Sequence, residues 1–536
     1  MRLSNLMARL GRAAAGGLAV VFISVLLAGV PARVAVAGDK TRSRAERAMR
    51  EGEYALAEQL FREALATDPR DQAARLGLSY ALLKMRLLAG AFEEAASVIA
   101  IDPLSARAHA IAGSALLASG DFPHAVEAYR TSLSLKEDES LAIAGLAMID
   151  YYENRLASSL WGLRRAVFLD SREPDYIFSL AQAAARAERY KEAADAYERF
   201  LQIAPRSDDD RRARIRGLID FLRYLGNIKS LYDLSGASST AVTFEMPNNR
   251  PILKVRVNGR REPLRFVLDT GSGMSVISDE TARLLGVSPV ARGGMARAVG
   301  GKFEIVYGFL RSVEIGDAKI ESVPVYIRRF YNDEVQVDGY IGLAVVNRYN
   351  VTVDYGARTF SLQRPNSGAA TAAADAAQRP ASLAGIEIPF RSTSSGFLSG
   401  EVQVEGVSRP FNFIIDTGAS ISVVSEKMME LDEMHDFKRP MRMKIYGAAG
   451  IAEGVQTLVL PRVLLGAQAR EKLDVAVLDL EPVNETTGFV QSGIIGGNFL
   501  RHFRVTFDFR KSVILLEPLE ASASSAEGRA VSAAKS

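Results

Sequence analysis

One short pattern occurs twice in the 536-residue chain, and it limits the fold of the C-terminal half more than any other feature. Residues 266–272 read Phe-Val-Leu-Asp-Thr-Gly-Ser, and residues 413–419 read Phe-Ile-Ile-Asp-Thr-Gly-Ala. In each copy, three large apolar residues, typical of a strand that is buried on both faces, end at an aspartate. A carboxylate in such a place is costly to bury alone. Two carboxylates that face each other can share a proton, so that one acts as a base while the other acts as an acid.

The duplication extends well beyond the tripeptide. A single Asp-Thr-Gly is a common turn and by itself predicts nothing more. Here the two copies also continue alike, with Gly-Met-Ser-Val-Ile-Ser at 273–278 and Ser-Ile-Ser-Val-Val-Ser at 420–425. Matching partner segments follow downstream, at 338–342 (Asp-Gly-Tyr-Ile-Gly) and 350–355 in the first copy and at 492–496 (Ser-Gly-Ile-Ile-Gly) and 504–509 in the second. The sequence therefore predicts two β lobes of one design.

This set of motifs resembles the retropepsin-like aspartic peptidases. The shared features are apolar residues before Asp-Thr-Gly-Ser/Ala, a glycine-rich hairpin, and an apolar-Ile-Gly segment before a last strand. Residues 493–498, Gly-Ile-Ile-Gly-Gly-Asn, are especially close to the matching retroviral segment. The resemblance covers roughly residues 251–363 and 385–517. It implies an all-β, bilobal unit with a pseudo-two-fold axis, in which both lobes belong to one chain and each contributes one Asp.

The resemblance and the chemistry of paired carboxylates together predict an aspartic-type endopeptidase. Asp269 and Asp416 are the expected catalytic residues and would hold one water between them. The ionised partner would take a proton from that water as it attacks the scissile carbonyl, and the protonated partner would stabilise the charge on the carbonyl oxygen. Such a reaction requires no metal and no organic cofactor.

Six residues are expected to support the pair. In the family, the threonine hydroxyls cross-link the two loops, and a glycine lets a backbone N–H approach the carboxylate and favour its charged form. Ser272 can donate a hydrogen bond to Asp269, whereas Ala419 cannot do the same for Asp416, and this asymmetry bears on which Asp stays charged. The predicted scaffold residues are Thr270, Gly271, Ser272, Thr417, Gly418 and Ala419.

Two glycine-rich hairpins are expected to cover a substrate peptide that lies extended and pairs through its backbone. They comprise residues 293–301 in lobe one and 446–450 in lobe two. Tyr446 is similar to the flap tyrosine of pepsin-like enzymes, which lies in their first lobe; the alternative is a tyrosine that only flanks a turn. The flap residues predicted to bind substrate are Gly300, Gly301, Tyr446, Gly447 and Gly450.

One departure from the retroviral pattern is visible in lobe two. Retroviral enzymes carry an Asp two residues after the catalytic Gly and an Arg in a Gly-Arg-Asn triplet. Here Ser420 and Gly497 occupy those places, which predicts that the corresponding ion pair is absent.

The N-terminal part repeats with a period of 34 residues, which is the signature of tetratricopeptide repeats (TPR). The step relates three sets of residues. Small residues at helix crossings are Ala57, Ala91, Ala125, Ser159 and Ala193, and apolar residues near helix ends are Leu65, Ile99, Leu133, Val167 and Leu201. The residues at helix exits are Pro69, Pro103, Glu137, Ser171 and Pro205. Five repeats and a capping helix at 211–225 would form an α-solenoid over residues 41–226. In the repeat at 73–102, Gly90 lies 13 residues before Pro103, whereas Gly52 lies 17 residues before Pro69, and this shift predicts a distorted inter-helix turn there. Solenoids of this kind bind peptides or protein partners, and a mere spacer is the alternative.

The remaining segments complete a multidomain chain, an α-solenoid followed by two all-β lobes. Residues 1–37 have a basic start, an apolar run and Ala-Val-Ala at the end, which predicts a secretory signal peptide cleaved after Ala37 and export to a bacterial periplasm or beyond. An uncleaved inner-membrane anchor is the alternative. The predicted linkers are 227–250 and 364–384, the lobes are 251–363 and 385–519, and the tail at 520–536 is expected to be disordered.

Composition excludes several other classes. The chain has no cysteine, which removes thiolate nucleophiles, disulfides and sulfur-ligated metals, and its four histidines lack the spacing of a metal pair. Lys and Arg number 66 against 63 Asp and Glu, so no nucleic-acid partner is expected. Two alternatives stay open at this point, namely a catalytically silent peptide-binding or adaptor protein, and lobes that pair between chains.

Overall fold

The computed structural model describes residues 32–298, 301–331, 335–365, 386–448 and 450–519. By contacts the chain divides into two compact units. One consists mainly of the first repeats up to residue 146, and the other holds residues 147–164, 173–202 and everything from 209 onward. The predicted apolar signal segment up to residue 31, most of the predicted inter-lobe linker and the predicted tail lie outside the described residues.

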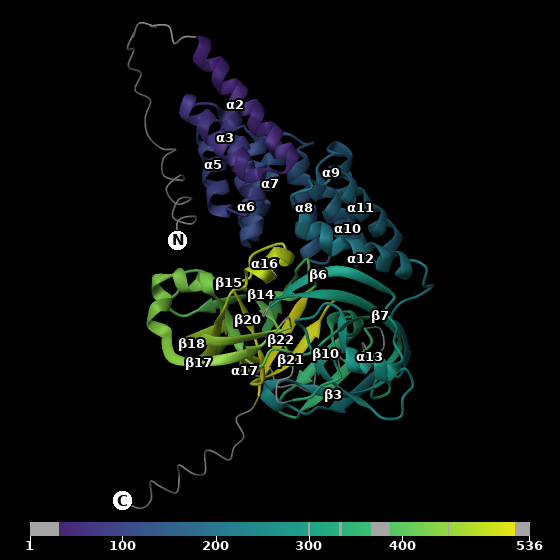
Figure 1. Cartoon of the computed structure of the whole chain (residues 1–536). Helices are drawn as coiled ribbons and strands as arrows, with labels where there is room; N and C mark the ends of the chain where they lie inside the picture. Colours follow the sequence, from purple (N-terminus) through teal and green to yellow (C-terminus); the bar gives the residue numbers. More distant parts are fainter. Residues whose placement is uncertain (1–31, 299–300, 332–334, 366–385, 449, 520–536) are drawn as a thin grey trace, which may run out of the picture. The chain divides into compact units, whose positions relative to one another are not determined.

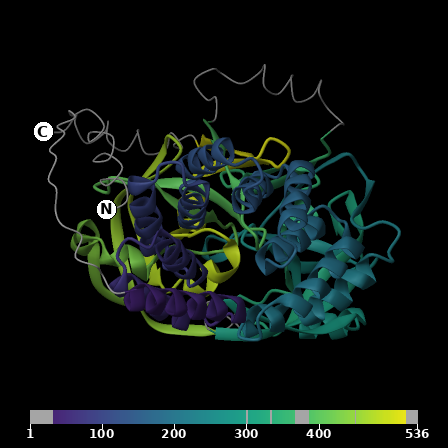
Figure 2. The same cartoon turned by 90° about the horizontal axis from the view of Figure 1, so that it is seen from above.

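The N-terminal part is built of paired helices with the predicted period (Figures 1 and 2). Five helices begin 34 residues apart: α3 (Tyr54–Thr67), α5 (Leu88–Ile101), α7 (Phe122–Leu135), α9 (Leu156–Leu169) and α11 (Tyr190–Ile203). The helices that precede or follow them are α2 (Ala32–Glu51), α4 (Gln72–Lys84), α6 (Ala106–Ser119), α8 (Ser140–Tyr152), α10 (Pro174–Arg186) and α12 (Asp209–Leu225). All five small residues predicted at helix crossings, from Ala57 to Ala193, have an exposed fraction of 0%. Because no side chain longer than Ser fits there, the small residues set the spacing of neighbouring helices.

The turn within each helix pair also recurs, and it corrects one prediction. A left-handed residue occupies the same place in every turn, with φ of 80° at Gly52, 59° at Arg86, 89° at Gly120, 60° at Asn154 and 60° at Glu188. The shifted position of Gly90 predicts a distorted turn in this repeat, and that prediction was wrong. Arg86 adopts the same left-handed backbone as the glycines, at the modest steric cost that this region imposes on an L residue.

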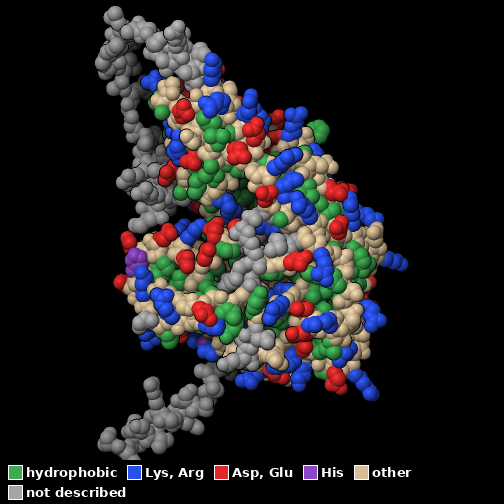
Figure 3. Space-filling model, in the orientation of Figure 1, with side chains coloured by type: hydrophobic (Ala, Val, Ile, Leu, Met, Phe, Trp, Pro, Cys, Tyr) green, Lys and Arg blue, Asp and Glu red, His purple; other side chains and the backbone are tan. Residues whose placement is uncertain are grey.

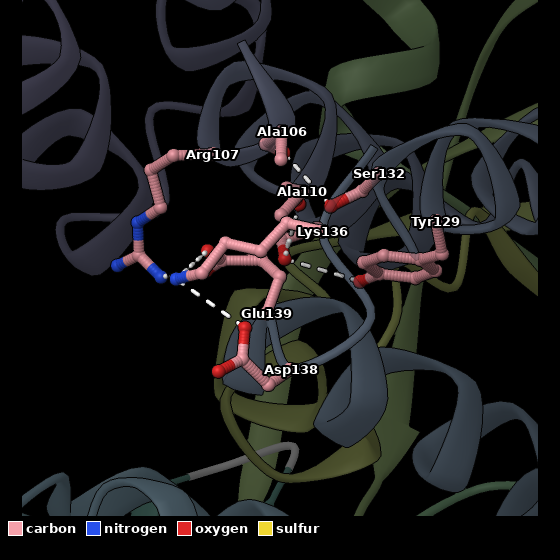
Figure 4. Close-up of polar contacts among 9 residues, drawn as sticks. Ala106, Arg107, Ala110, Tyr129, Ser132, Lys136, Asp138 and Glu139 are labelled. Atoms are coloured by element: carbon pink, nitrogen blue, oxygen red, sulfur yellow. Dashed lines mark hydrogen bonds and ion pairs between the residues drawn. The ribbon is translucent and has the colours of Figure 1, made fainter. Parts of the chain in front are cut away.

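Polar contacts add to the packing between α6, α7 and the segment that follows them (Figure 4). Arg107 donates to Glu139 Oε1 at 2.8 Å, and the Ser132 hydroxyl donates to the carbonyl of Ala106 at 2.8 Å. The buried hydroxyl of Tyr129 donates to Ser114 Oγ at 3.1 Å. Tyr129 is 1% exposed, so it is a core residue of the repeats, as are Leu163 and Tyr197 at 0% and 4%.

Lobe one is an eight-stranded sheet with the order β1-β8-β5-β9-β4-β3-β7-β6. Its strands are β1 (Asp233–Gly236), β3 (Ile252–Val257), β4 (Leu264–Leu268), β5 (Ser275–Ser278), β6 (Ala291–Ala298), β7 (Gly301–Ile315), β8 (Ala318–Arg328) and β9 (Gly339–Ile341). The predicted turn begins the connection from β3 to β4: Asn258 and Gly259 both have positive φ, 53° and 76°, and Arg260 N–H donates to the carbonyl of Val257 at 3.0 Å. A two-residue turn of this handedness matches the twist of antiparallel strands.

Lobe two repeats this arrangement, with the order β13-β14-β15-β20-β16-β19-β18-β17. Its strands are β13 (Arg391–Ser392), β14 (Leu398–Val404), β15 (Phe411–Ile415), β16 (Ser422–Ser425), β17 (Lys438–Tyr446), β18 (Ile451–Leu465), β19 (Gln468–Leu478) and β20 (Gly493–Ile495). The strand before each Asp pairs in parallel with the strand before the Ile-Gly segment, β4 with β9 and β15 with β20. The sequence duplication is therefore a duplication of structure.

A six-stranded sheet joins the two lobes, in the order β12-β22-β21-β10-β11-β2. Its strands are β2 (Ser239–Thr243), β10 (Asn350–Asp354), β11 (Thr359–Gln363), β12 (Ile386–Pro389), β21 (Phe503–Asp508) and β22 (Val513–Pro518). The lobes meet where β10 pairs antiparallel with β21, and Thr352 lies opposite Thr506. Residues 227–250, predicted as a linker, instead supply β1 and β2 to two sheets, because edge strands β8 and β11 leave backbone groups that these short segments can pair.

Surface charge and helix length give no further indication of function in the described residues. On the face drawn in Figure 3, basic and acidic side chains are interspersed, as the near balance of charge in the sequence leads one to expect. Among the described residues, no helix is both long and apolar enough to cross a membrane.

Candidate active site

The two aspartates follow equivalent strands and are fixed in the same way. Asp269 comes directly after β4, and its N–H donates to the carbonyl of Ile341 at 3.0 Å. Asp416 comes after β15, and its N–H donates to the carbonyl of Ile495 at 2.9 Å. The parallel pairing of β4 with β9 and of β15 with β20 thus sets the backbone of each Asp.

The structure brings the two Asp-Thr-Gly loops into direct contact. A Cβ added to Gly271 would lie 2.4 Å from Asp416 Oδ2, and one added to Gly418 would lie 2.7 Å from Asp269 Oδ1. Each glycine therefore leaves room for the carboxylate of the opposite lobe. Since both loops belong to one chain, a second chain is not needed to bring the two carboxylates together.

The predicted threonine scaffold forms a reciprocal set of four hydrogen bonds between the lobes. Thr270 Oγ1 donates to the carbonyl of Ile415 and Thr417 Oγ1 donates to that of Leu268, both at 2.7 Å. In return, Thr417 N–H donates to Thr270 Oγ1 at 3.0 Å, and Thr270 N–H donates to Thr417 Oγ1 at 3.2 Å. Both threonines are buried, at 2% and 0% exposure. Because buried polar groups are costly to leave unpaired, these bonds fix the two loops against each other.

The hydrogen bonds to the two carboxylates differ. Gly271 N–H donates to Asp269 Oδ1 at 3.0 Å, and Ser272 Oγ donates to Asp269 Oδ2 at 2.5 Å. Within its own loop, Asp416 accepts from backbone groups, Gly418 N–H at 2.7 Å and Ala419 N–H at 3.2 Å. Every predicted scaffold residue thus lies at the pair, and Ser272 supplies the hydroxyl that distinguishes the two aspartates.

These surroundings separate the proton affinities of the pair. Burial raises the pKa of Asp269, and the Ser272 hydroxyl partly offsets that rise. Burial raises the pKa of Asp416 well above its usual range, and the neighbouring charge of Asp269 raises it further. Two carboxylates in contact cannot both ionise easily, and the Ser272 hydroxyl favours the charged form of Asp269.

The two predicted flaps are β-hairpins. In lobe one β6 pairs with β7, and Gly301 is the first residue of β7, while Gly300 lies outside the described residues. In lobe two β17 pairs with β18, and Gly447 N–H donates to the carbonyl of Gly450 at 2.8 Å across the tip. Tyr446 ends β17 and is 44% exposed.

The flap of lobe one lies against the last helix of the repeats. A Cβ added to Gly217 in α12 would lie 2.5 Å from the carbonyl oxygen of Arg292 in β6. Beside it, the ring of Phe221 stacks on Tyr307 of β7 with centroids 4.2 Å apart (the helix and strands are labelled in Figure 1). The helix predicted only as a cap therefore supports the flap as well.

Ser420 and Gly497, the two positions at which lobe two departs from the retroviral pattern, both lie against Asn249. The Asn249 amide donates to the carbonyl of Ser420 at 3.2 Å, and Arg501 donates to Asn249 Oδ1 at 3.0 Å. A Cβ at Gly497 would lie 2.1 Å from the carbonyl oxygen of Asn249, which explains why glycine stands there. Asn249, in the segment before β3, therefore connects lobe one to lobe two at these positions.

Three further residues, which the sequence motifs did not indicate, support the site. Ser275 Oγ and Ser422 Oγ accept from the N–H groups of Gly342 and Gly496, both at 3.0 Å. Their equal distance from the two aspartates in the sequence was the signal that could have identified them. The third residue, Arg328, lies at the end of β8 and lowers the pKa of Asp269 through its charge. No sequence signal distinguished it from Arg329.

Other sites for chemistry are sparse in the described part of the chain. It contains no group of three or more His, Asp or Glu side chains that could hold a metal ion. A separate cavity of about 760 Å³ is lined by residues that include Glu245, Arg265 and Arg358. Neither aspartate lines it, so the dyad and not this cavity is the candidate active site.

Comparison with known proteins agrees with this division of the chain. A family described as aspartyl protease matches residues 253–345 and 400–499, and two tetratricopeptide-repeat families match residues 48–115 and 145–208. No curated protein matched. Similar solved structures include a thermophilic TPR protein of Thermus thermophilus (20% identity, 33% of this chain and 95% of that one, TM-score 0.29) and pilF of Pseudomonas aeruginosa (18% identity, 36% and 89%, TM-score 0.27). The chain therefore carries tetratricopeptide repeats in its N-terminal part and, in two segments of its C-terminal part, a retropepsin-like aspartyl protease domain.

Proposed function

We propose that the protein is an aspartic endopeptidase in which Asp269 and Asp416 activate one water for attack on a peptide bond. The observation that carries the proposal is the contact between the two loops. The reciprocal bonds of Thr270 and Thr417 hold the loops together, and each carboxylate lies against the glycine of the opposite loop. Loops fixed in this way present two carboxylates of unequal proton affinity to one substrate atom, which is what acid–base catalysis needs.

The reaction follows from the unequal pair. Ionised Asp269 accepts a proton from the water as the water oxygen bonds to the carbonyl carbon, while Asp416 donates its proton to the carbonyl oxygen. The product of this step is a neutral tetrahedral diol, and the shared proton now resides on Asp269. Asp269 then donates that proton to the amide nitrogen as the C–N bond breaks, and Asp416 takes back a proton from the diol. The water and the peptide are consumed, and a carboxylic acid and an amine are released.

The surroundings of the pair also define the expected pH dependence. Activity requires one proton on the pair, so it should rise as the first carboxyl ionises and fall as the second ionises. Burial raises the pKa of both groups. Both limbs of the profile are therefore expected above the pH at which an exposed aspartate titrates, about 4.

Single substitutions test the proposal. Asp269→Asn and Asp416→Asn should each lower kcat/KM on a peptide library by at least about a thousandfold, because each removes one half of the acid–base pair. Asp317→Asn is the matched control, since this exposed carboxylate in the β7–β8 turn lies in the same lobe. Mass spectrometry of the cleaved library across a pH series is the measurement, and full activity in either dyad variant would contradict a shared dyad.

A silent protein would give a different result. If the lobes only bind peptides, the wild-type protein should cleave nothing in the library between acid and neutral pH, yet bind peptides detectably by calorimetry. A statine-type inhibitor separates the two cases further, since its hydroxyl occupies the place of the attacking water. Failure to bind this inhibitor across the same pH range would favour the silent adaptor.

The repeats and the N-terminal segment extend the proposal. TPR repeats generally mediate protein–protein interactions, and here they would present a substrate or partner protein to the peptidase lobes. The basic and apolar start of the sequence would direct the protein out of the cytoplasm, to a periplasm or a secreted state. Cell fractionation and the N-terminal mass of the purified protein test this. An intact Met1 in the membrane fraction would indicate an anchor and not a cleaved signal.

A further inference from the structure

Arg328 lies between the two flaps, close to the dyad. Its guanidinium donates to the carbonyl of Ala448, in the tip of the lobe-two flap. On the other side, its Cζ is 5.6 Å from the ring centroid of Phe303, near the start of flap strand β7 in lobe one. One side chain thus contacts both hairpins that are expected to close over a substrate.

A short chain of contacts connects Arg328 to Asp269. The Arg328 Cζ lies 5.9 Å from the ring centroid of Tyr340 and 5.2 Å from that of Phe330, and these two rings pack edge to face with centroids 5.1 Å apart. Tyr340 directly precedes Ile341, whose carbonyl accepts from the N–H of Asp269. The charges of Arg328 and Asp269 also act on each other. The guanidinium is therefore part of the same site.

The charge of Arg328 is only partly compensated. In the described ranges, Arg328 forms no ion pair with an Asp or Glu, and its contacts include three aromatic rings and one backbone carbonyl. Burial lowers the pKa of Arg328, yet arginine stays protonated at any physiological pH. A half-buried guanidinium in such surroundings gains most from an added carboxylate, whose two oxygens match its planar donors.

We propose that Arg328 is a specificity-determining residue that binds a carboxylate of the substrate next to the scissile bond, so that the enzyme prefers acidic peptides. This inference rests on the proposed peptidase function and names its substrate class. The substrate carboxylate would replace the Ala448 carbonyl as acceptor, and the three rings would exclude water from the new ion pair. The carboxylate has two possible sources, an Asp or Glu side chain or the C-terminus of the peptide.

A purely structural role is the main competing explanation. If Arg328 only ties the two flaps together, its loss would change cleavage of every peptide by the same factor. Recognition of a carboxylate would instead change the ratio between matched acidic and neutral peptides. The ratio is therefore the decisive measurement, and it does not depend on how much total activity a variant retains.

The experiment compares full-length wild-type protein with Arg328→Met and Arg328→Lys on three peptide forms. The three forms share one cleavable sequence. They compare Glu with Gln beside the scissile bond, and a free C-terminus with an amidated one. The wild type should cleave the preferred carboxylate form about 10- to 100-fold better in kcat/KM than its neutral partner, the range expected for one desolvated charge-assisted pair. Arg328→Met should reduce this ratio to about one, and Arg328→Lys should restore part of it.

Arg329→Met is the matched control, because it removes an equal charge from the neighbouring exposed position. It should leave the ratio unchanged. If the wild type discriminates between the Glu and Gln peptides, the recognised group is a side-chain carboxylate. If it discriminates between the free and the amidated peptide, the recognised group is the C-terminal carboxylate. If the wild type cleaves peptides but shows no ratio, or Arg328→Met keeps it, the inference is wrong while the peptidase proposal stands. If the wild type cleaves none of the peptides or the library, the peptidase proposal itself fails.

Discussion

Single residues decide how the two halves of the dyad differ. In both loops the glycine N–H donates to the carboxylate, and Asp416 also accepts from the Ala419 N–H at 3.2 Å. The side-chain difference is the hydroxyl of Ser272, which has no counterpart at Ala419. A hydrogen bond to the charged form of a carboxylate lowers its pKa, so one hydroxyl assigns the base and the acid.

Replacing Ser272 by Ala should therefore move the acid limb of the pH profile. Loss of the hydroxyl raises the pKa of Asp269 further, so ionisation and activity should begin at a higher pH. The measurement is kcat/KM against pH on one peptide. Ala419→Ser is the matched control, and it should act on the alkaline limb by lowering the pKa of Asp416. An unchanged acid limb in Ser272→Ala would show that the hydroxyl does not set the order of ionisation.

At the scale of elements, helix α12 and flap strand β6 depend on each other. The helix carries Gly217 where the backbone of Arg292 comes closest, so that a side chain is excluded. Glycine normally destabilises a helix interior by about 1 kcal/mol relative to alanine. The close approach of the strand explains why it is present.

Gly217→Ala should consequently weaken the protein instead of stabilising it. The added methyl group would meet the Arg292 carbonyl at 2.5 Å and push β6 away from the helix. Hydrogen–deuterium exchange of residues 291–298 should become faster, and KM for a peptide should rise more than kcat falls. Gly90→Ala in α5 is the control, since its Cβ would meet only the flexible Leu82 side chain at 3.3 Å. Equal, stabilising effects of both substitutions would argue against the close contact.

At the scale of the whole molecule, the boundary between units does not follow the boundary between families. The repeats from residue 173 to 202 and helix α12 belong to the unit that holds both lobes. Contacts explain this, because Arg186 donates to the carbonyl of Thr393, and Phe221 stacks on Tyr307. The last repeats are therefore structural parts of the protease region.

Two core substitutions should distinguish the units. Phe221→Ala and Phe61→Ala each remove a ring that is 1% exposed, at a cost of about 3–5 kcal/mol. Phe221→Ala should lower the denaturant concentration at which the lobes and α12 lose their protection against exchange. Phe61→Ala should lower the corresponding concentration for α2 to α7. Hydrogen exchange read by mass spectrometry in a urea series resolves the two. If both variants lowered the same transition equally, the chain would unfold as a single cooperative body.

Features that are repeated locally could be predicted from the sequence. The 34-residue step predicted the helical repeats and the small residues at their crossings, and the duplicated Asp-Thr-Gly segments predicted two like lobes and the residues at their junction. These signals are readable because each repeat satisfies the same packing requirement in the same local pattern. The conformation of the turn at Arg86 was not predicted, because neighbouring helices can impose a left-handed backbone on a residue that seldom adopts one.

Contacts between distant segments form only once the chain has folded. Strands β1 and β2 arise from a polar stretch because edges of two sheets are available to pair with them. Asn249 fills the space beside Gly497, α12 supports a flap, and Arg328 contacts both flaps, although none of these has a local pattern. Such roles depend on which surfaces meet after folding, and the free energy that selects them comes from partners far away in the sequence.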